Sequence, residues 1–428
     1  MSSAAYAARQ GASAALVEKG PAIGGSAIYA RFIHTTPTVE AMREVNPGGD
    51  PKLSSRVVER YAEGLDWVRS FGVRMADPVP VIGYSRGCLT DMPGYLHACE
   101  RVVREHGEVL VSSTTQRLLL EDGAVAGAVI RTAAGDERVI RARSTLLATG
   151  GFGGDPELRA KHIHPLSGDL PLRANVYSTG DGLRLGQSAG AAFGPANAGF
   201  YGHLIPSRVE YTNPYEFTDL TFYHGEHGII VNVAGRRFCD ETIGDHINAL
   251  EVLEQPDARA LMVTDQRVHD QWMMTPYVEG VPPLDRFKLA SERGARTAVA
   301  ESIDELDALP EEWGYPGQVV RDTLEEFNEQ CKSGRPSPAR KRDAAPLVDP
   351  PYYAIEVIPA ITYTYSGLTI DEHARVLDSD GAPIRGLLAA GADAGGVFYR
   401  AYVGGLATAL VFGLEAAATA LAQPSRVA

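Results

Sequence analysis

The sequence predicts an α/β fold, because apolar strands and helices alternate at both ends of the chain. Residues 2–18 are predicted to form a helix followed by a short strand. Residues 144–154 and 387–396 each combine an apolar strand with a glycine-rich turn, and an Ala-rich helix follows at 406–422. Together these segments predict a parallel sheet with glycine-rich loops at its strand ends.

Length and composition limit the function classes. The chain has 428 residues, enough for about two or three domains, and 44% of them are hydrophobic. With 40 basic and 54 acidic residues its net charge is −14, which argues against nucleic acid as a partner. We find no apolar run of about 18 residues and no signal peptide, so we expect no membrane span. Four cysteines without a C-x-x-C pair favour a cytoplasmic protein with reduced thiols.

The N-terminal segment has the order of half a nucleotide-binding unit. Ser2–Arg9 is rich in alanine, and Gly11 follows where a helix ends. The strand predicted at 12–17 leads to Glu18, the place of a ribose-binding acid in dinucleotide-binding βαβ units. We expect the first strand of that unit and its glycine-rich phosphate turn to lie upstream of Met1.

The next elements follow from periodicity and turn residues. Apolar positions at helical spacing predict helices at 54–71 and 95–106. Four short strands separated by turn signals predict an antiparallel meander at 109–111, 116–120, 125–131 and 137–141.

The middle of the chain is less regular. We predict helices at 183–191 and 319–331 and strands at 228–233, 261–264, 352–358 and 364–370. A Pro-rich, basic stretch at 332–350 predicts an exposed crossing between domains.

Glycines at the C-terminal end predict a cofactor site built from both chain ends. Gly404 and Gly405 open the last helix, so bare backbone N–H groups and a positive dipole end are available there. Without a Cβ, the backbone can approach a ring or phosphate closely. We pair this helix start with Glu18 as two parts of one site.

Five segments carry a resemblance to a known family: LVEKGPAIGGS, LLATGGFGGDPELR, STGDGLRLGQSAGAAF, GIIVNVAGRRFCDE and GLLAAGADAGG with GGLATALVFG. They resemble the FAD-dependent fumarate reductase/succinate dehydrogenase flavoproteins, a family that includes ketosteroid and tricarballylate dehydrogenases. The resemblance implies a Rossmann-like FAD-binding domain of glutathione-reductase type at 1–151 and 342–428. It also implies an inserted α+β capping domain at 152–341, with substrate between cap and flavin.

The resemblance also implies FAD contacts. The matching positions are Glu18, Lys19, Gly24, Gly25, Ser26, Thr149, Gly150, Asp181, Ala392, Asp393, Gly404, Gly405 and Leu406. Two motifs depart from the family: the Asn of Gly-Gly-Asn-Ser is absent, and the usual Ala-Gly-Glu turn reads Ala-Gly-Ala at 390–392.

The catalytic positions depart further. Fumarate reductases carry an arginine proton donor after R-F-x-x-E, where this chain has Thr-Ile-Gly-Asp-His at 242–246. Substrate-binding His and Arg positions are occupied by Tyr363 and Tyr402. A carboxylate-binding, Arg-donor reductase is therefore disfavoured. We predict Tyr402 as a carbonyl polariser or proton-transfer residue, with Tyr363 or His203 as its partner and Arg400 as a candidate carboxylate ligand.

Several interpretations remain open. We prefer a dehydrogenase that transfers hydride between flavin N5 and a C–C bond next to a carbonyl or carboxyl. The first alternative is an enoate-type reductase with Asp245 or His246 as proton donor; the second is a flavin-free binding protein or remnant, since the phosphate turn is absent. Tyr363 and Tyr365 alternate on one strand, so packing is the competing role for both. We expect a small ketone or acid substrate, an unidentified electron acceptor and no metal.

Overall fold

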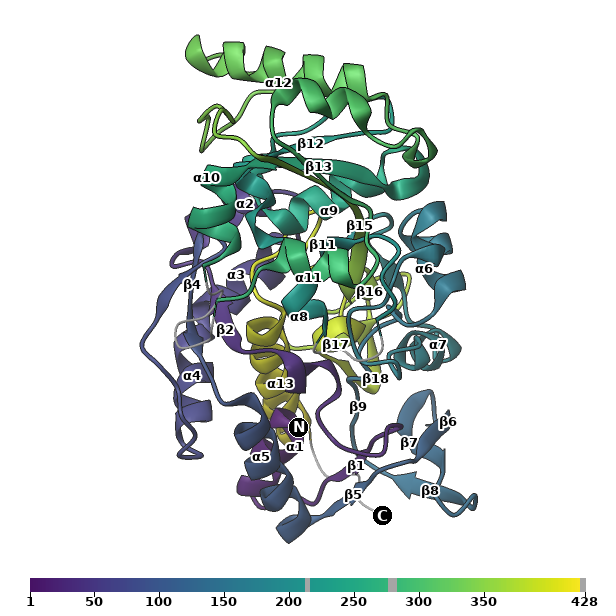
Figure 1. Ribbon diagram of the computed structural model, residues 1–428. Coiled ribbons are helices and arrows are strands. Elements are labelled where there is room, and N and C mark those ends of the chain that lie inside the picture. Colours follow the sequence, from purple (N-terminus) through teal and green to yellow (C-terminus); the bar gives the residue numbers. More distant parts are fainter. Residues whose placement is uncertain (212–215, 276–282, 424–428) are drawn as a thin grey trace. The chain divides into compact units, whose positions relative to one another are not determined.

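The chain forms two compact units in the computed structural model, which describes residues 1–211, 216–275 and 283–423 (Figure 1). The first unit comprises Met1–Gly168, Ala174–Phe200 and Tyr363–Ala428, and the second comprises Asp169–Arg173 and Tyr201–Thr362. These limits differ from the predicted 152–341 insertion, because most of 152–200 lies in the first unit. That the second unit is a capping domain stays a prediction.

The first unit contains most of the helices. Its helices are α1 (Ser2–Arg9), α2 (Val39–Val45), α3 (Pro51–Glu59), α4 (Tyr61–Arg69), α5 (Met92–His106), α6 (Pro156–His162), α7 (Asp181–Ser188) and α13 (Gly405–Ala422). Its strands are β1 (Ala15–Val17), β2 (Phe32–Thr35), β3 (Val79–Val81), β4 (Ser85–Leu89), β5 (Glu108–Leu110), β6 (Thr114–Glu121), β7 (Ala124–Arg131), β8 (Glu137–Arg141), β9 (Thr145–Leu147), β10 (Phe193–Gly194), β16 (Gly367–Leu368), β17 (Arg375–Leu377) and β18 (Pro383–Ala389).

The parallel pairs join distant parts of the sequence. Strand β1 pairs with β5, and β9 pairs with β18, both in parallel. Antiparallel pairing of β6, β7 and β8 confirms the predicted meander, although β5 joins β1 instead. The α/β fold class predicted from the sequence is confirmed.

Helix α13 is the buried centre of the first unit. It lies beside α1 in Figure 1, and Ala5 and Ala8 of α1 are buried. Its 18 residues are long and apolar enough to cross a membrane by length and composition alone. The prediction that no apolar run reaches that length is therefore wrong. More than half of this helix is buried inside the protein, as expected of a core helix.

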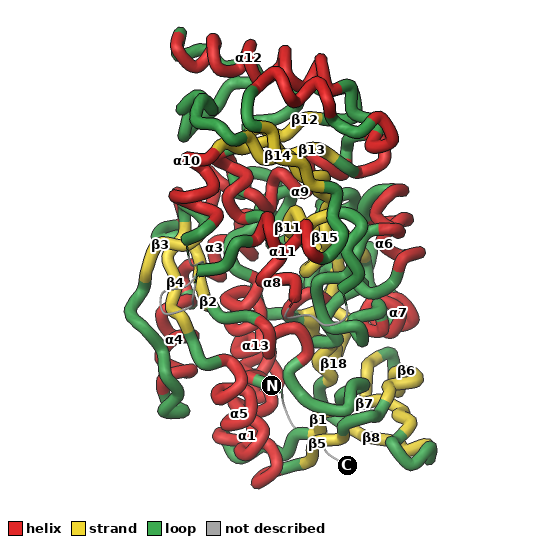
Figure 2. Tube along the Cα trace, in the orientation of Figure 1, coloured by secondary structure: helices red, strands yellow, loops and turns green. Residues whose placement is uncertain are grey.

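The second unit is a mixed α and β structure. Its strands β11 (Phe200–Pro206), β15 (Tyr352–Thr364), β13 (Ala260–Asp265) and β12 (Ile229–Val231) form one sheet in that order, with β14 (Thr297–Ala300) also on β15. Its helices are α8 (Glu216–Leu220), α9 (Asp245–Leu253), α10 (Gln266–Val268), α11 (Arg286–Glu292) and α12 (Gly317–Lys332). Figure 2 shows helix α12 beside the strands of this sheet. Leu324 of α12 shares a hydrophobic core with Ile229 and Val263 of the sheet.

The predicted helix at 54–71 is two helices, since α3 ends at Glu59 and α4 begins at Tyr61. Both are tied to α13 by Glu415, whose carboxylate lies 2.9 Å from Arg56 Nη2 and 3.3 Å from Arg60 Nε. The Glu415 side chain is 8% exposed, so the carboxylate shared by the two ion pairs is buried.

We expect Glu415→Gln to lower the free energy of unfolding by about 2 kcal/mol, because it removes the buried counter-charge of Arg56 and one of the two carboxylates that pair with Arg60, the other being Glu63. This is below the value for fully buried pairs because both arginines are partly exposed. Thermal unfolding measures the loss. The control is Asp66→Asn, which breaks an exposed pair with Arg69 and costs at most about 0.5 kcal/mol. Equal effects of the two variants would contradict the assignment.

Candidate active site

The end of β1 gathers three of the predicted cofactor residues. Glu18 follows the strand directly, and its Oε1 accepts a hydrogen bond from the Gly20 N–H at 2.7 Å. Lys19 Nζ donates to Asp181 Oδ2 at 2.8 Å and to Thr179 Oγ1 at 2.6 Å. The T-G-D-G motif thus lies beside Lys19 and Glu18 within the first unit, as expected if these residues belong to one cofactor site.

The loop after β1 contacts the same segment. Gly24 and Gly25 both have positive φ, which favours glycine at this sharp turn. The hydroxyl of Ser26 accepts a hydrogen bond from the Asn175 N–H at 3.0 Å. Gly24, Gly25 and Ser26 are therefore held against the segment that carries Asp181. Their contacts with a cofactor stay predictions.

Asp393 fastens the C-terminal turn to the turn after β9. Its carboxylate accepts from the Thr149 N–H at 2.5 Å, the Thr149 hydroxyl at 3.0 Å and the Gly151 N–H at 3.0 Å. Burial raises the pKa of Asp393, and the hydrogen bonds from Thr149 and Gly151 oppose that rise. Sequence reasoning placed Ala392 and Asp393 at the cofactor but missed this bond between chain regions.

Thr149 also contacts the first turn of α7, which begins at Asp181 within the T-G-D-G motif. Its hydroxyl oxygen accepts from the Gly182 N–H at 2.9 Å. Gly150 has positive φ, and a Cβ there would lie 2.5 Å from the Ser178 hydroxyl. The two turns and the start of α7 therefore pack too closely for larger residues.

Helix α13 begins with an uncapped N-terminus. Gly404 has a φ of 100°, no side chain caps the helix, and its first turn has no acidic residue. A Cβ on Gly404 would overlap the carbonyl oxygen of His34 in β2. A Cβ on Gly405 would lie 3.2 Å from the Tyr402 hydroxyl and 3.3 Å from the Tyr363 ring. Two predicted catalytic tyrosines thus flank the positive end of α13, at Gly404, Gly405 and Leu406.

These tyrosines belong to an aromatic cluster. Phe398 lies between Tyr365 and Tyr402, with ring centroids 5.8 and 5.7 Å away, and the rings of Tyr363 and Tyr402 are 6.4 Å apart. The hydroxyl oxygens of Tyr363 and Tyr365 are buried without a hydrogen-bond partner among the described residues. Burial raises the pKa of both phenols, so both stay protonated as hydrogen-bond donors.

The arrangement fits a flavin ring and a substrate oxygen beside it. Buried polar atoms are nearly always hydrogen-bonded, so the two partnerless hydroxyls point to a bound acceptor. The uncapped helix start supplies further N–H donors. Arg400, the fourth predicted catalytic residue, donates its backbone N–H to the Ala198 carbonyl at 2.8 Å. A catalytic role for the Arg400 side chain stays a prediction.

His203 lies in the second unit. Its Nδ1 is hydrogen-bonded to Asp245 Oδ2, and its Nε2 lies 2.7 Å from the Tyr201 hydroxyl. Partnership between His203 and Tyr402 stays a prediction. Sequence reasoning did not single out Tyr201; the Tyr-x-His spacing on one strand was the available signal.

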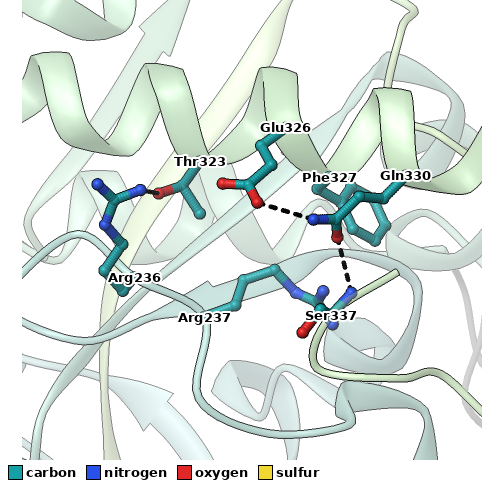
Figure 3. Close-up of a pocket in the computed structure, with 7 residues that line it drawn as sticks. All are labelled: Arg236, Arg237, Thr323, Glu326, Phe327, Gln330 and Ser337. Carbon is teal, nitrogen blue, oxygen red and sulfur yellow. Dashed lines mark hydrogen bonds between the residues drawn. The ribbon is translucent and has the colours of Figure 1, made fainter. Parts of the chain in front are cut away.

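The second unit also holds a small cavity of about 70 Å³, shown in Figure 3. Its polar lining is already hydrogen-bonded: Arg236 donates to the Thr323 hydroxyl, and Gln330 bridges Glu326 and the Ser337 N–H. We assign no site to it. Among the described residues, no group of three or more His, Cys, Asp or Glu side chains is placed to hold a metal ion.

Comparison with known proteins decides the family. The FAD binding domain family matches residues 1–406. This chain belongs to that family. Its cofactor is FAD, and it is an FAD-dependent oxidoreductase.

Two curated relatives and one solved structure illustrate the range of this flavoprotein family. A vinyl phenol reductase from Lactiplantibacillus plantarum is 27% identical, covering 91% of this chain and 87% of the relative. A 3-oxosteroid 1-dehydrogenase from Mycolicibacterium smegmatis is 28% identical over 75% of this chain and 61% of its own. The 3-ketosteroid-Δ4-(5α)-dehydrogenase of Rhodococcus jostii shares the fold, with a TM-score of 0.77, 20% identity and coverage of 99% and 94%.

We expect Gly404→Ala to lower the amount of FAD that copurifies with the flavoprotein, because the new Cβ displaces either β2 or the start of α13. Visible flavin absorbance per protein measures this. The control is Gly381→Ala: Gly381 also has positive φ, but no atom lies within 4 Å of its Cβ position. The control shares the backbone strain of roughly 1–2 kcal/mol and should retain FAD. Equal FAD loss in both variants would refute the steric argument.

Proposed function

We propose that this flavoprotein dehydrogenates a C–C bond next to the carbonyl group of a small ketone. The observation that carries the proposal is the pair of partnerless buried hydroxyls, Tyr363 and Tyr365, beside the uncapped start of α13. These are neutral donors and suit a carbonyl oxygen. A carboxylate substrate would call for cationic ligands, and two of the family's cationic positions carry Tyr363 and Tyr402 here.

The tyrosines would act by stabilising charge on the substrate oxygen. Removal of a proton next to a carbonyl leaves an enolate, and preoriented donors in a buried site stabilise that charge strongly. Raised pKa values keep Tyr363 and Tyr365 as donors throughout. When bound, FAD supplies hydride-transfer chemistry, and Gly404, Gly405 and Leu406 would hold its ring system.

A second candidate is the reverse reaction, reduction of a conjugated C=C bond. Asp245 favours it. The resemblance puts the arginine proton donor of fumarate reductases in this stretch, and burial raises the pKa of Asp245 to about 8. A carboxyl that is protonated near neutral pH is a plausible acid for protonating carbon. Relatives that carry reductase names, such as the vinyl phenol reductase, support this candidate.

Two half-reactions separate the candidates. We expect 4-androstene-3,17-dione or another ketone with an adjacent CH–CH bond to bleach the oxidised flavin under anaerobic conditions, with an unsaturated product by mass spectrometry. A reductase would instead leave the oxidised flavin unchanged, and its photoreduced flavin would be reoxidised by 4-vinylphenol, acrylate or fumarate. If the FAD-loaded protein shows neither half-reaction with ketones or conjugated alkenes, the proposed function is wrong.

We expect Tyr363→Phe to lower the rate of the active half-reaction by about 100-fold, the usual cost of one oxyanion donor. FAD content should stay unchanged, because the ring is kept. The control is Tyr353→Phe, which removes a hydroxyl on β15 that donates a hydrogen bond to Gln266 Oε1. A rate for Tyr363→Phe equal to that of the control would show that Tyr363 is a packing residue.

A further inference from the structure

Asn46 lies between two helices of the first unit, α2 and α3. It follows α2 directly, and its N–H donates to the Met42 carbonyl oxygen at 2.9 Å. Asp50 precedes α3, and its carboxylate accepts two backbone N–H groups from the first turn of that helix. The loop 46–50 is therefore held at both ends by helices. Asn46 itself is buried, with an exposed fraction of 2%.

The side-chain amide of Asn46 binds the backbone on both sides of Phe398. Its Nδ2 donates to the Val397 carbonyl oxygen at 2.8 Å, and its Oδ1 accepts the Tyr399 N–H at 3.1 Å. One side chain thus supplies a donor and an acceptor to a segment about 350 positions further along the chain. Loss of the Asn46 amide would leave the buried Val397 carbonyl without this partner, which is a costly change.

The same loop is connected to the backbone of Tyr365. The Asp50 N–H donates to the Gly396 carbonyl oxygen at 2.8 Å, and the Gly396 N–H donates to the Tyr365 carbonyl oxygen at 3.3 Å. Gly396 therefore links the loop 46–50 to one of the two tyrosines whose buried hydroxyls are partnerless among the described residues. The position of the loop bears on both Phe398 and Tyr365.

The backbone turns sharply just after Phe398. Arg400 has a φ of 47°, a left-handed conformation that residues other than glycine adopt rarely. Such conformations persist where the surrounding contacts fix them, and they cluster at functional sites. The Arg400 N–H donates to the Ala198 carbonyl oxygen at 2.8 Å. Hydrogen bonds thus fix the backbone of the segment 396–400 before and after Phe398.

The Phe398 side chain transmits this arrangement to the tyrosines. It is 1% exposed, and its ring centroid lies 6.4 Å from that of Tyr363, 5.8 Å from that of Tyr365 and 5.7 Å from that of Tyr402. Buried side chains are close-packed, so a displaced Phe398 ring would either leave a void or push against the tyrosine rings. Asn46, Phe398 and the tyrosines all belong to the first unit.

We propose that Asn46 is a positioning residue of the candidate active site: by fixing the backbone around Phe398, it determines where the rings of Tyr363, Tyr365 and Tyr402 lie. This inference rests on the proposed function, because an effect on rate requires the tyrosine hydroxyls to polarise the substrate carbonyl. Preoriented donors act only at the correct distance from the developing charge. Because Asn46 acts through Phe398, its loss should lower the rate at saturating substrate more than it weakens substrate binding.

Asn328 of α12, in the second unit, provides a matched control. Its Nδ2 donates to the Leu347 carbonyl oxygen at 2.7 Å, and its Oδ1 accepts the Leu347 N–H at 2.8 Å. Asn328 is 7% exposed, so it is buried like Asn46. Truncation of either side chain removes two hydrogen bonds to the backbone from a buried place. Asn46→Ala and Asn328→Ala should therefore lower the Tm by similar amounts.

The rate of the active half-reaction separates the two variants. We expect Asn46→Ala to lower the limiting rate per bound flavin by roughly 10- to 100-fold, because a misplacement of about 1 Å can cost that much. The substrate concentration that gives half of this rate should change less. Asn328→Ala should stay close to the wild-type rate. Equal slowing in both variants would overturn the proposal, because it would indicate general destabilisation.

A structural measurement decides the positioning role without any substrate. In FAD-loaded protein labelled with 4-fluorophenylalanine at its 12 phenylalanines, Phe398→Leu and Phe327→Leu identify the ¹⁹F signals of these two residues. Asn46→Ala should shift or broaden the Phe398 signal and leave the Phe327 signal in place. Asn328→Ala, next to Phe327, should do the reverse. An unchanged Phe398 signal in Asn46→Ala would overturn the proposal, and so would a changed signal with an unchanged rate.

Gly49→Ala tests the same contact if Asn46→Ala does not fold. It keeps the Asn46 side chain, but a Cβ on Gly49 would lie 2.2 Å from Asn46 Nδ2 and 2.6 Å from the Val397 carbonyl oxygen, so the amide must move. We expect the same change in the Phe398 signal and a slower half-reaction, and the absence of both would overturn the proposal. If the Phe398 signal changes but the wild-type protein shows neither half-reaction, the proposed function is wrong, and the role of Asn46 is confined to the place of the aromatic rings.

Discussion

The first unit depends on the hydrogen bonds of one buried carboxylate. Its chain comes from three separate segments, and Asp393 joins the third to the first by accepting three hydrogen bonds at Thr149 and Gly151. Thr149 in turn accepts from Gly182, which brings in the middle segment. Charge-assisted bonds to backbone N–H groups are short and directional, so they fix the positions of both glycine-rich turns. The uncapped start of α13 and the tyrosine cluster are positioned on this frame.

Burial then decides the chemistry of the ionisable groups. Removing phenols and carboxyls from water disfavours their charged forms, which is why Tyr363, Tyr365 and Asp245 all have raised pKa values. The tyrosines become permanent donors, because their pKa values lie far above physiological pH. Asp245 differs because its pKa falls within the range in which a proton can be gained and lost. Burial thus keeps the two phenols in one protonation state but leaves Asp245 able to change its state near neutral pH.

The elements that sequence predicted best have local signals. The α1–β1–Glu18 order, the β6–β8 meander and α13 follow from periodicity and turn residues, and each was predicted within a few residues. The break at Arg60 was missed, because the apolar spacing continues across it in α3 and α4. Membership of 174–200 in the first unit was also missed. It depends on contacts such as Lys19–Asp181, which join residues 162 positions apart.

Contacts between residues far apart in the sequence also limited the prediction of the candidate site. The positions of Tyr402, Tyr363 and His203 in the sequence were enough to select them as candidates. Whether a buried hydroxyl has a hydrogen-bond partner cannot be predicted from sequence, so the partnerless hydroxyls of Tyr363 and Tyr365 were found only in the structure. The pairing of His203 with Asp245 spans 42 residues and has no periodic signature. An arginine stays charged at all physiological pH values. A buried aspartic acid with a pKa of about 8, as Asp245 has, changes its charge there.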